Sequence, residues 1–251
     1  IYTQSIKENI MVKRVNAVNG NLLSQKRIHY YRTNRITNSS LGCYLSHLNT
    51  WKIGLRQQTD IAIIEDDIIL APNIRSNLDV IMQTELPSNW DILYLGCTRP
   101  CGKRISNSLL AVTSEYTKHK CHKQNAGAYA YIVRKKALPI LIKGCHTPPF
   151  YKMVDHQMCT LHANPLNVYI CNPPLVTHDF TIPSDRIKGK IYNQKYQTLA
   201  TTTTLISADH SDNLYMPFQN VSTTLTHTKR MSRDQLLKQN TISRLYKMAL
   251  T

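Results

Sequence analysis

The chain has 251 residues, 42% of them hydrophobic, which is enough apolar surface for the core of one large domain or two small ones. Its formal net charge of +16 indicates either attraction to polyanions, such as nucleic acid, an anionic membrane or a phosphorylated ligand, or a solvated basic surface without a partner. No apolar run approaches the roughly 18 residues of a membrane-spanning helix. The chain opens with Ile1 and no signal-peptide pattern, so we expect a processed form or a fragment.

Apolar spacing in the first part of the chain predicts a helix, a strand and a second helix. Residues 41–55 are apolar at helical spacing, with Ser39 or Ser40 placed to cap the start. Residues 60–70 have the pattern of a buried strand, which three adjacent acids interrupt. A helix is predicted from residue 73 to about 85, where Pro87 ends it.

The same alternation continues to about residue 171. Residues 99–124 are polar, basic and rich in Cys and His, and we predict a loop or lid there. Strands that alternate with helices imply an α/β fold with a mostly parallel sheet. We predict strands at 91–97, 128–133 and 167–171 and helices at 135–143 and 153–161.

The composition changes after about residue 187, which predicts a domain at 1–187 followed by a basic polar tail at 188–251. Residues 188–228 are rich in Thr, Ser, Asn, Gln and Lys, and are typical of a linker. Residues 233–250 carry apolar side chains among basic ones and predict an amphipathic helix. This helix either lies on a membrane or docks on the domain.

The acidic triplet Glu65-Asp66-Asp67 lies at the predicted end of a buried strand. In a strand, Glu65 and Asp67 would share one face and Asp66 would point the other way. Ligands of open α/β sheets bind outside such strand ends, and two adjacent carboxylates favour a divalent cation, Mn²⁺ or Mg²⁺, between them. The alternative is a turn of solvated acids paired with Lys or Arg.

Several cysteines and histidines gather in and near the predicted loop. They could hold zinc, although their spacing matches no common zinc site, or Cys97 could form a disulfide with Cys101 or Cys121. The group comprises Cys97, Cys101, His119, Cys121 and His122.

Seven motifs occur in order: VKRVNAVNG (12–20), LGCYLSHLNTWK (41–52), IAIIEDDIIL (61–70), WDILYLG (90–96), NAGAYAYIVRKKAL (125–138), MVDHQM (153–158) and VYICNPPLV (168–176). Over about residues 12–185 the sequence resembles the family 25 glycosyltransferases, which include bacterial lipooligosaccharide and animal collagen galactosyltransferases. The resemblance implies a GT-A type nucleotide-sugar-binding fold, with a mostly parallel central sheet flanked by helices. It also implies a UDP-sugar donor, usually UDP-galactose, Mn²⁺, and inversion at the sugar carbon.

The resemblance also implies roles for the acidic triplet and its neighbours. Glu65-Asp66-Asp67 stands where the family has its DxD-like motif, so Asp67 would bind the metal, and Glu65 would face the donor ribose or the waters of the metal. Ser46 and His47 match a Ser-His pair near the donor site. The family's opening strand is not recognisable in IYTQSIKENI, residues 1–10.

Three further residues complete the predicted site. By the same resemblance, Asp155 is the candidate base that takes the proton of the acceptor hydroxyl, and His178 is a further metal ligand by analogy with GT-A enzymes generally. Gly127 either permits a tight backbone approach or leaves room for the donor sugar.

Three of these side chains also have structural interpretations. His47 lies at helical spacing with core residues and would be a hydrogen-bonded core histidine. Asp155 would be an ordinary acid at a helix start, favoured by the helix dipole, and His178 a loop histidine.

The sequence thus predicts a metal-dependent inverting transferase that moves a hexose, galactose first among them, to a saccharide or hydroxylated acceptor in lipopolysaccharide or other glycan biosynthesis. The alternatives are a degenerate transferase fold that binds polyanions or membranes, and a metal-dependent nuclease or phosphatase. With 8% aromatic residues and no recognised motif, we do not expect nucleic acid as a partner. We expect a cytoplasmic location with peripheral membrane contact through the tail; a lumenal location stays open.

Overall fold

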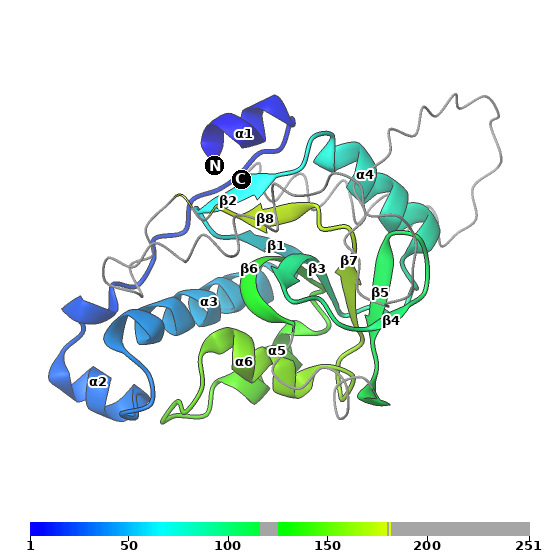
Figure 1. Ribbon diagram of the computed structural model, residues 1–251. Helices are drawn as coiled ribbons and strands as arrows, with labels where there is room; N and C mark the ends of the chain where they lie inside the picture. Colours follow the sequence, from blue (N-terminus) through cyan, green and yellow to red (C-terminus); the bar gives the residue numbers. More distant parts are fainter. Residues whose placement is uncertain (116–124, 180, 182–251) are drawn as a thin grey trace, which may run out of the picture.

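The computed structural model describes residues 1–115, 125–179 and 181 (Figure 1). The predicted linker 188–228 and basic helix 233–250 lie outside these ranges, so the division into a domain and a tail stays a prediction. Within the described ranges, no helix combines the length and the apolar character needed to cross a membrane.

A six-stranded sheet forms the centre of the fold, in the strand order β1-β6-β3-β7-β5-β4. The strands are rich in Ile, Leu, Val and Tyr, whose branched and aromatic side chains pack well on a pleated surface. The predicted strands at 91–97, 128–133 and 167–171 are confirmed as β3, β6 and β7. The bounds are β1 (Ile61–Ile64), β3 (Ile92–Thr98), β4 (Lys103–Arg104), β5 (Leu109–Val112), β6 (Ala126–Val133) and β7 (Val168–Cys171).

The prediction of a mostly parallel sheet is wrong. Of the five neighbouring pairs in this sheet, as the structure describes it, only β3 and β7 run parallel. Strand β6 lies between β1 and β3 and runs against both. A strand that is buried on both faces has the same apolar pattern in either direction, so the sequence does not reveal its direction. Strands β1, β3 and β7 still point the same way, and their carboxyl ends lie at one edge of the sheet.

A second sheet contains the two antiparallel strands β2 (Ile68–Leu70) and β8 (Val176–His178). The predicted strand at 60–70 therefore divides at the acidic triplet, because β1 belongs to the central sheet and β2 to the smaller one. Three adjacent charges cannot continue a buried strand without partners, which explains the break at this point. Strand β8 was not predicted.

Helix α3 (Asn38–Gln57) packs on one face of the central sheet and confirms the helix predicted at 41–55. It begins earlier than expected, because the hydroxyl of Thr37 accepts a hydrogen bond from the Ser40 N–H at 3.1 Å and caps the helix in place of the predicted serines. Its apolar face is fully buried. The largest of the side chains there are Leu41, Tyr44, Leu48 and Trp51.

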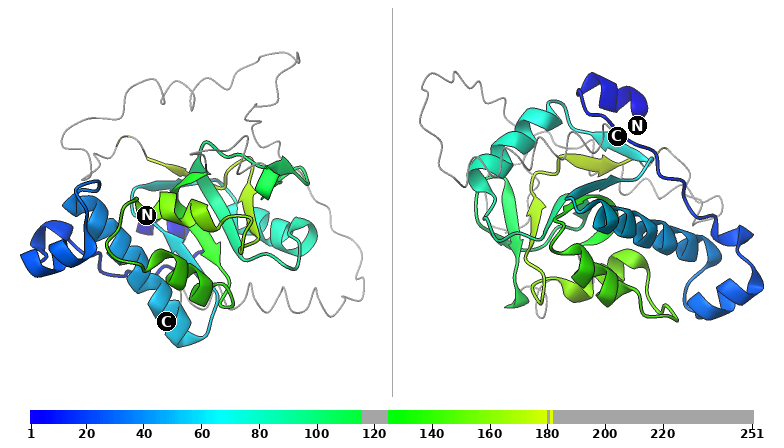
Figure 2. Two further views of the ribbon diagram at one scale, coloured as in Figure 1. Left: turned by 90° about the horizontal axis from the view of Figure 1, so that it is seen from below. Right: turned by 180° about the vertical axis from the view of Figure 1, so that it is seen from behind.

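Helices α5 (Leu138–Cys145) and α6 (Val154–Met158) cover the same face as α3, as Figures 1 and 2 show. They confirm the helices predicted at 135–143 and 153–161, the second of which ends in a 3₁₀ turn, η4 (Cys159–Leu161).

The opposite face is covered by helix α4 (Ile74–Val80), a π-helical turn η2 (Ile81–Glu85) and the sheet β2–β8. The first two elements confirm the helix predicted from residue 73 to about 85. The molecule thus has three layers, with the central sheet between two separate hydrophobic cores.

Some elements were not predicted. Residues 99–124 contain the β4–β5 hairpin, so the prediction of a loop is wrong for that part, while residues 116–124 lie outside the described ranges. The others are α1 (Tyr2–Lys7), η1 (Gly20–Leu22) and α2 (Gln25–Tyr31). The amide side chain of Gln4 in α1 bonds the backbone of Ile68 and Leu70, and so satisfies polar groups of β2.

Candidate active site

The candidate site lies at the edge where β1 and β3 end and β6 begins. Ile64 of β1 is opposite Ala130, and Thr98 of β3 is opposite Ala126. The acidic triplet directly follows β1, so the fold carries it to the carboxyl edge of the sheet. Ligands of open α/β sheets bind at such an edge.

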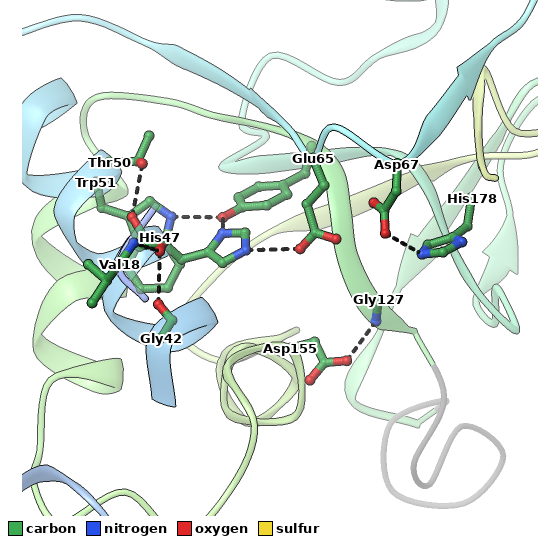
Figure 3. A network of polar contacts seen from close by, with 12 residues as sticks. Val18, Gly42, His47, Thr50, Trp51, Glu65, Asp67, Gly127, Asp155 and His178 are labelled. Carbon is green, nitrogen blue, oxygen red and sulfur yellow. Dashed lines mark hydrogen bonds and ion pairs between the residues drawn. The ribbon is translucent and has the colours of Figure 1, made fainter. Parts of the chain in front are cut away.

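Backbone hydrogen bonds fix both ends of the acidic triplet. The Glu65 N–H donates to the Tyr129 carbonyl at 2.8 Å, and the Asp179 N–H donates to the Asp67 carbonyl at 2.8 Å. Glu65 and Asp67 are half-buried and their carboxylates point to the same side, whereas Asp66 is exposed (Figure 3). The exposure of the three side chains therefore alternates as expected, although the three residues lie between β1 and β2 and not in a strand.

Asp67 is paired with His178, as Nε2 of the histidine lies 3.0 Å from Oδ2 of the aspartate. The His178 ring also stands edge-on to the ring of Tyr129, with 6.0 Å between centroids. The two side chains are about one fifth exposed, so solvent can reach the pair. The structure thus brings together two residues that the sequence analysis assigned to the same metal.

Glu65 is paired with His47, at 3.3 Å between Oε1 and Nε2. The other ring nitrogen of His47 lies 2.8 Å from the hydroxyl of Tyr131, which also accepts a hydrogen bond from the Trp51 indole at 2.9 Å. Burial opposes the charged form of His47, but Tyr131, Cys43 and Glu65 favour it and raise its pKa well above the ordinary value. His47 is thus a hydrogen-bonded core histidine, and it also touches the candidate site.

Asp155 lies in the first turn of α6 and faces Gly127. Its Oδ2 accepts the Gly127 N–H at 2.9 Å, and its Oδ1 accepts the His156 N–H at 2.8 Å. Gly127 has a φ of 90°, and a Cβ there would lie 2.8 Å from the Thr98 hydroxyl. Gly127 therefore permits the tight backbone approach that was predicted. In Figure 3, Asp155 faces the same space as Glu65 and Asp67, from the opposite side.

Ser46 has a different environment from the one expected for a donor-binding residue. Its hydroxyl accepts the Val18 N–H and donates to the Gly42 carbonyl, both at 2.8 Å. A Cβ on Gly42 would lie 2.4 Å from the Val18 carbonyl, so the loop before α2 lies directly against α3. Ser46 holds this loop on the helix, and its role toward the donor stays a prediction.

Sequence reasoning missed Tyr131 and Cys43. Tyr131 lies in the strand predicted at 128–133, and it is fully buried there. A buried tyrosine hydroxyl needs a hydrogen-bond partner, and that is the signal that would have pointed from β6 to His47. Cys43 lies one helical turn before His47, on the same face of α3.

The cysteine predictions are corrected in part. Cys97 is a buried free thiol, so neither of its predicted disulfides forms. Cys101 is disulfide-bonded and is therefore not a zinc ligand. His119, Cys121 and His122 lie outside the described residues.

The structure also has a cavity that is separate from these carboxylates. It is bordered by α3, α5, α6 and the segment 147–152, and none of the predicted site residues lines it. Its lining includes Tyr44, Cys145, Phe150, Lys152 and Gln157.

Comparison with known proteins gives one family. The sequence model of glycosyltransferase family 25 (LPS biosynthesis protein) matches residues 1–158. A glycosyltransferase 25 family member of Drosophila melanogaster is 34% identical over 71 residues, which are 28% of this chain and 12% of the fly protein. Procollagen galactosyltransferase 1-B of Xenopus laevis is 30% identical over 102 residues, 35% of this chain and 17% of the frog protein.

Some of the related proteins are named as inactive. The inactive glycosyltransferase 25 family member 3 of Mus musculus is 32% identical over 69 residues, 26% of this chain and 12% of the mouse protein. The matched segments span less than a fifth of the length of these three relatives. The family model, in contrast, matches more than half of the chain, and the chain belongs to glycosyltransferase family 25.

Proposed function

We propose that this protein is a metal-dependent inverting glycosyltransferase. It moves a hexose, for which we propose galactose, from a UDP-sugar to a hydroxyl group of a saccharide or a hydroxylated acceptor. The observation that carries the proposal is that Glu65, Asp67 and Asp155 face one space at the carboxyl edge of the sheet, in a member of family 25. The name of the Xenopus relative supports galactose as the sugar, and the family description supports glycan biosynthesis.

The residues at the acidic turn fit a divalent cation. Glu65 and Asp67 offer hard oxygen ligands, and a positive ion would offset the repulsion between two half-buried carboxylates. His178 adds an imidazole nitrogen, which suits Mn²⁺ better than Mg²⁺. When bound, the ion would act as a Lewis acid toward the leaving diphosphate.

Asp155 is the candidate general base. Its carboxylate is held in place by the hydrogen bonds that it accepts from two backbone N–H groups. Each of its oxygens keeps a second lone pair. Such a carboxylate can take the proton of an acceptor hydroxyl that lies within about 3 Å, while the hydroxyl oxygen attacks the sugar carbon. Attack on the side opposite the leaving diphosphate gives inversion in a single displacement.

The fold supports a GT-A type assignment. Three strands end at the edge that carries the acidic turn, and helices flank a mixed α/β sheet. A sugar nucleotide bound across this edge would place its diphosphate beside Asp67 and its hexose toward Asp155 and Gly127.

Two observations favour a second candidate, a degenerate transferase fold that binds polyanions or a membrane. The mouse relative is named inactive, and the chain carries a net charge of +16. Such a module would bind anionic polymers with a steep salt dependence and would leave UDP-sugars intact. Membrane contact through the tail 188–251 belongs to this proposal as well.

The deciding experiment measures UDP release from UDP-galactose with Mn²⁺ and a panel of saccharide and hydroxylated peptide acceptors. We expect acceptor-dependent release by the wild-type chain, and its loss in Asp67→Ala. Asp60→Ala is the matched control, since Asp60 precedes the opposite end of β1 and bonds the Lys135 backbone. Equal release by Asp67→Ala would remove the metal role, and salt-dependent polyanion binding without release would favour the second candidate.

A further inference from the structure

Cys43, His47 and Glu65 form a compact group of potential metal ligands beside the candidate active site. Each offers one ligand atom, and these three atoms lie within 4.8 Å of one another. Cys43 and His47 are one turn apart on α3 and therefore lie on the same face of the helix. Glu65 reaches the group from the end of β1 and already lies 3.3 Å from His47.

We propose that these three residues form a zinc site, which shares Glu65 with the proposed Mn²⁺ site but does not include its other ligands, Asp67 and His178. Thiolate, imidazole and carboxylate are the ligands that Zn²⁺ takes in proteins, whereas Mn²⁺ and Mg²⁺ favour oxygen. Metal–ligand bonds of about 2.0 to 2.3 Å place the ligand atoms of a tetrahedral ion roughly 3.5 Å apart. The observed separations therefore need only small side-chain movements.

The surroundings of His47 favour binding through Nε2. The Trp51 indole can only donate, so the Tyr131 oxygen accepts from it and can accept a second bond from the Nδ1–H of His47. This leaves Nε2 directed at Glu65, where the ion would take the place of the proton that the two side chains share. A fixed hydrogen bond on the far ring nitrogen is the usual support of a metal-binding histidine.

An exchangeable zinc ion needs a site that solvent can reach and that leaves one coordination position open, and this group has both properties. Cys43 and Glu65 are half-buried while His47 is buried, so solvent reaches two of the three ligand residues. Three protein ligands leave the fourth position of a tetrahedral ion for water or a ligand. On binding, the Cys43 thiol gives up its proton to solvent.

The zinc site does not depend on the proposed sugar transfer. Its three ligands exclude Asp67 and Asp155, so a chain without transferase activity would still bind the ion. Glu65 is the residue that the two sites share, because its other carboxylate oxygen points toward the side of Asp67 (Figure 3).

The test is a Co²⁺ titration of the full 251-residue chain with its free thiols reduced, followed by competition with Zn²⁺. Wild type should develop a near-ultraviolet cobalt–thiolate charge-transfer band that Zn²⁺ abolishes, and Cys43→Ser should lack the band. Cys159→Ser is the matched control, because Cys159 is also a half-buried cysteine outside any disulfide and its loss should leave the band intact. Tyr131→Phe should keep the band but weaken Co²⁺ binding by roughly 10- to 100-fold.

The proposal is overturned if wild type gives no band at saturating Co²⁺, or if Cys43→Ser gives the wild-type band. It is also overturned if Asp67→Asn removes the band, since the ion would then belong to the candidate donor site. Failure of UDP release with an intact band would reject the proposed transferase activity and leave the zinc site standing. Far-ultraviolet circular dichroism of each variant establishes that a lost band is not a lost fold.

Discussion

His178 Nε2 lies 3.0 Å from Asp67 Oδ2, although the two residues are far apart in the sequence. The small sheet creates this contact, because Ile68 of β2 is opposite His178 of β8 and the Asp179 N–H bonds the Asp67 carbonyl at 2.8 Å. The backbone therefore positions the histidine independently of its charge. The β2–β8 sheet thus places the imidazole of His178 beside the acidic triplet.

Replacing His178 by Gln should weaken Mn²⁺ binding while it preserves the small sheet. We expect the Mn²⁺ concentration for half-maximal thermal stabilisation, with UDP-galactose present, to rise roughly 10- to 100-fold. His29→Gln is the control, because His29 is exposed on α2. An unchanged Mn²⁺ requirement in His178→Gln would show that His178 only holds Asp67 in place.

Replacing Gly127 by Ala should destabilise the protein through the backbone. The φ of 90° is strained for alanine, and its Cβ would lie 2.8 Å from the Thr98 hydroxyl. We expect a loss of about 1 to 3 kcal/mol in the free energy of unfolding, measured by urea titration. The double variant with Thr98→Ala should recover part of this loss, because it removes the contact and leaves the backbone strain. A Gly127→Ala variant of wild-type stability would contradict the assigned geometry.

Asp155→Asn separates the catalytic role of this residue from its structural one. The amide oxygen can still accept the Gly127 N–H, but the amide nitrogen cannot accept the His156 N–H. The amide also cannot take a proton from an acceptor. At saturating UDP-galactose we expect kcat per folded molecule to fall by about 10²- to 10⁴-fold, and the thermal midpoint to fall only by the loss of the His156 hydrogen bond. If Asp155 only holds α6 to β6, the midpoint would fall and the transfer rate per folded molecule would stay at the wild-type value.

The predictions from sequence succeeded where apolar spacing alone determines the element. Helix α3 and strands β3, β6 and β7 follow from that spacing, since a helix repeats every 3.6 residues and a buried strand forms a short apolar run. The direction of β6 does not follow, because reversing a strand that is buried on both faces leaves its pattern unchanged. The β4–β5 hairpin could not be predicted for another reason. Strand β4 has only the residues Lys103 and Arg104, both exposed, so it has no apolar pattern.

The candidate site was predictable through its acids and not through the residues that support them. Three adjacent carboxylates beside a buried strand stand out in any sequence, because charges there need partners. Tyr131 has no such signal, since a tyrosine in an apolar strand is an ordinary core residue. Its contact with His47 depends on how α3 packs on β6, and this tertiary information is absent from local spacing.

A buried histidine outside the candidate site gives a pH prediction. Burial lowers the pKa of His162 to about 4, and the Tyr94 hydroxyl lies 3.2 Å from its Nε2, to which it can donate while the ring is neutral. The unfolded chain, with an ordinary histidine pKa of about 6.5, binds this proton more readily, so stability falls as the pH falls from about 6.5 to 4. Between pH 7 and pH 5, the titration of this residue alone should lower the free energy of unfolding by about 2 kcal/mol.

His162→Gln tests this assignment, because the glutamine side chain can accept the Tyr94 hydroxyl but does not titrate. Urea unfolding at pH 7 and pH 5 should show a smaller acid-induced loss of stability in this variant than in wild type, by about 2 kcal/mol. The absolute stability at pH 7 does not enter the comparison, since each protein is measured against itself. His29→Gln removes an exposed histidine and should keep the wild-type difference. Equal losses in wild type and His162→Gln would mean that His162 takes up its proton without unfolding.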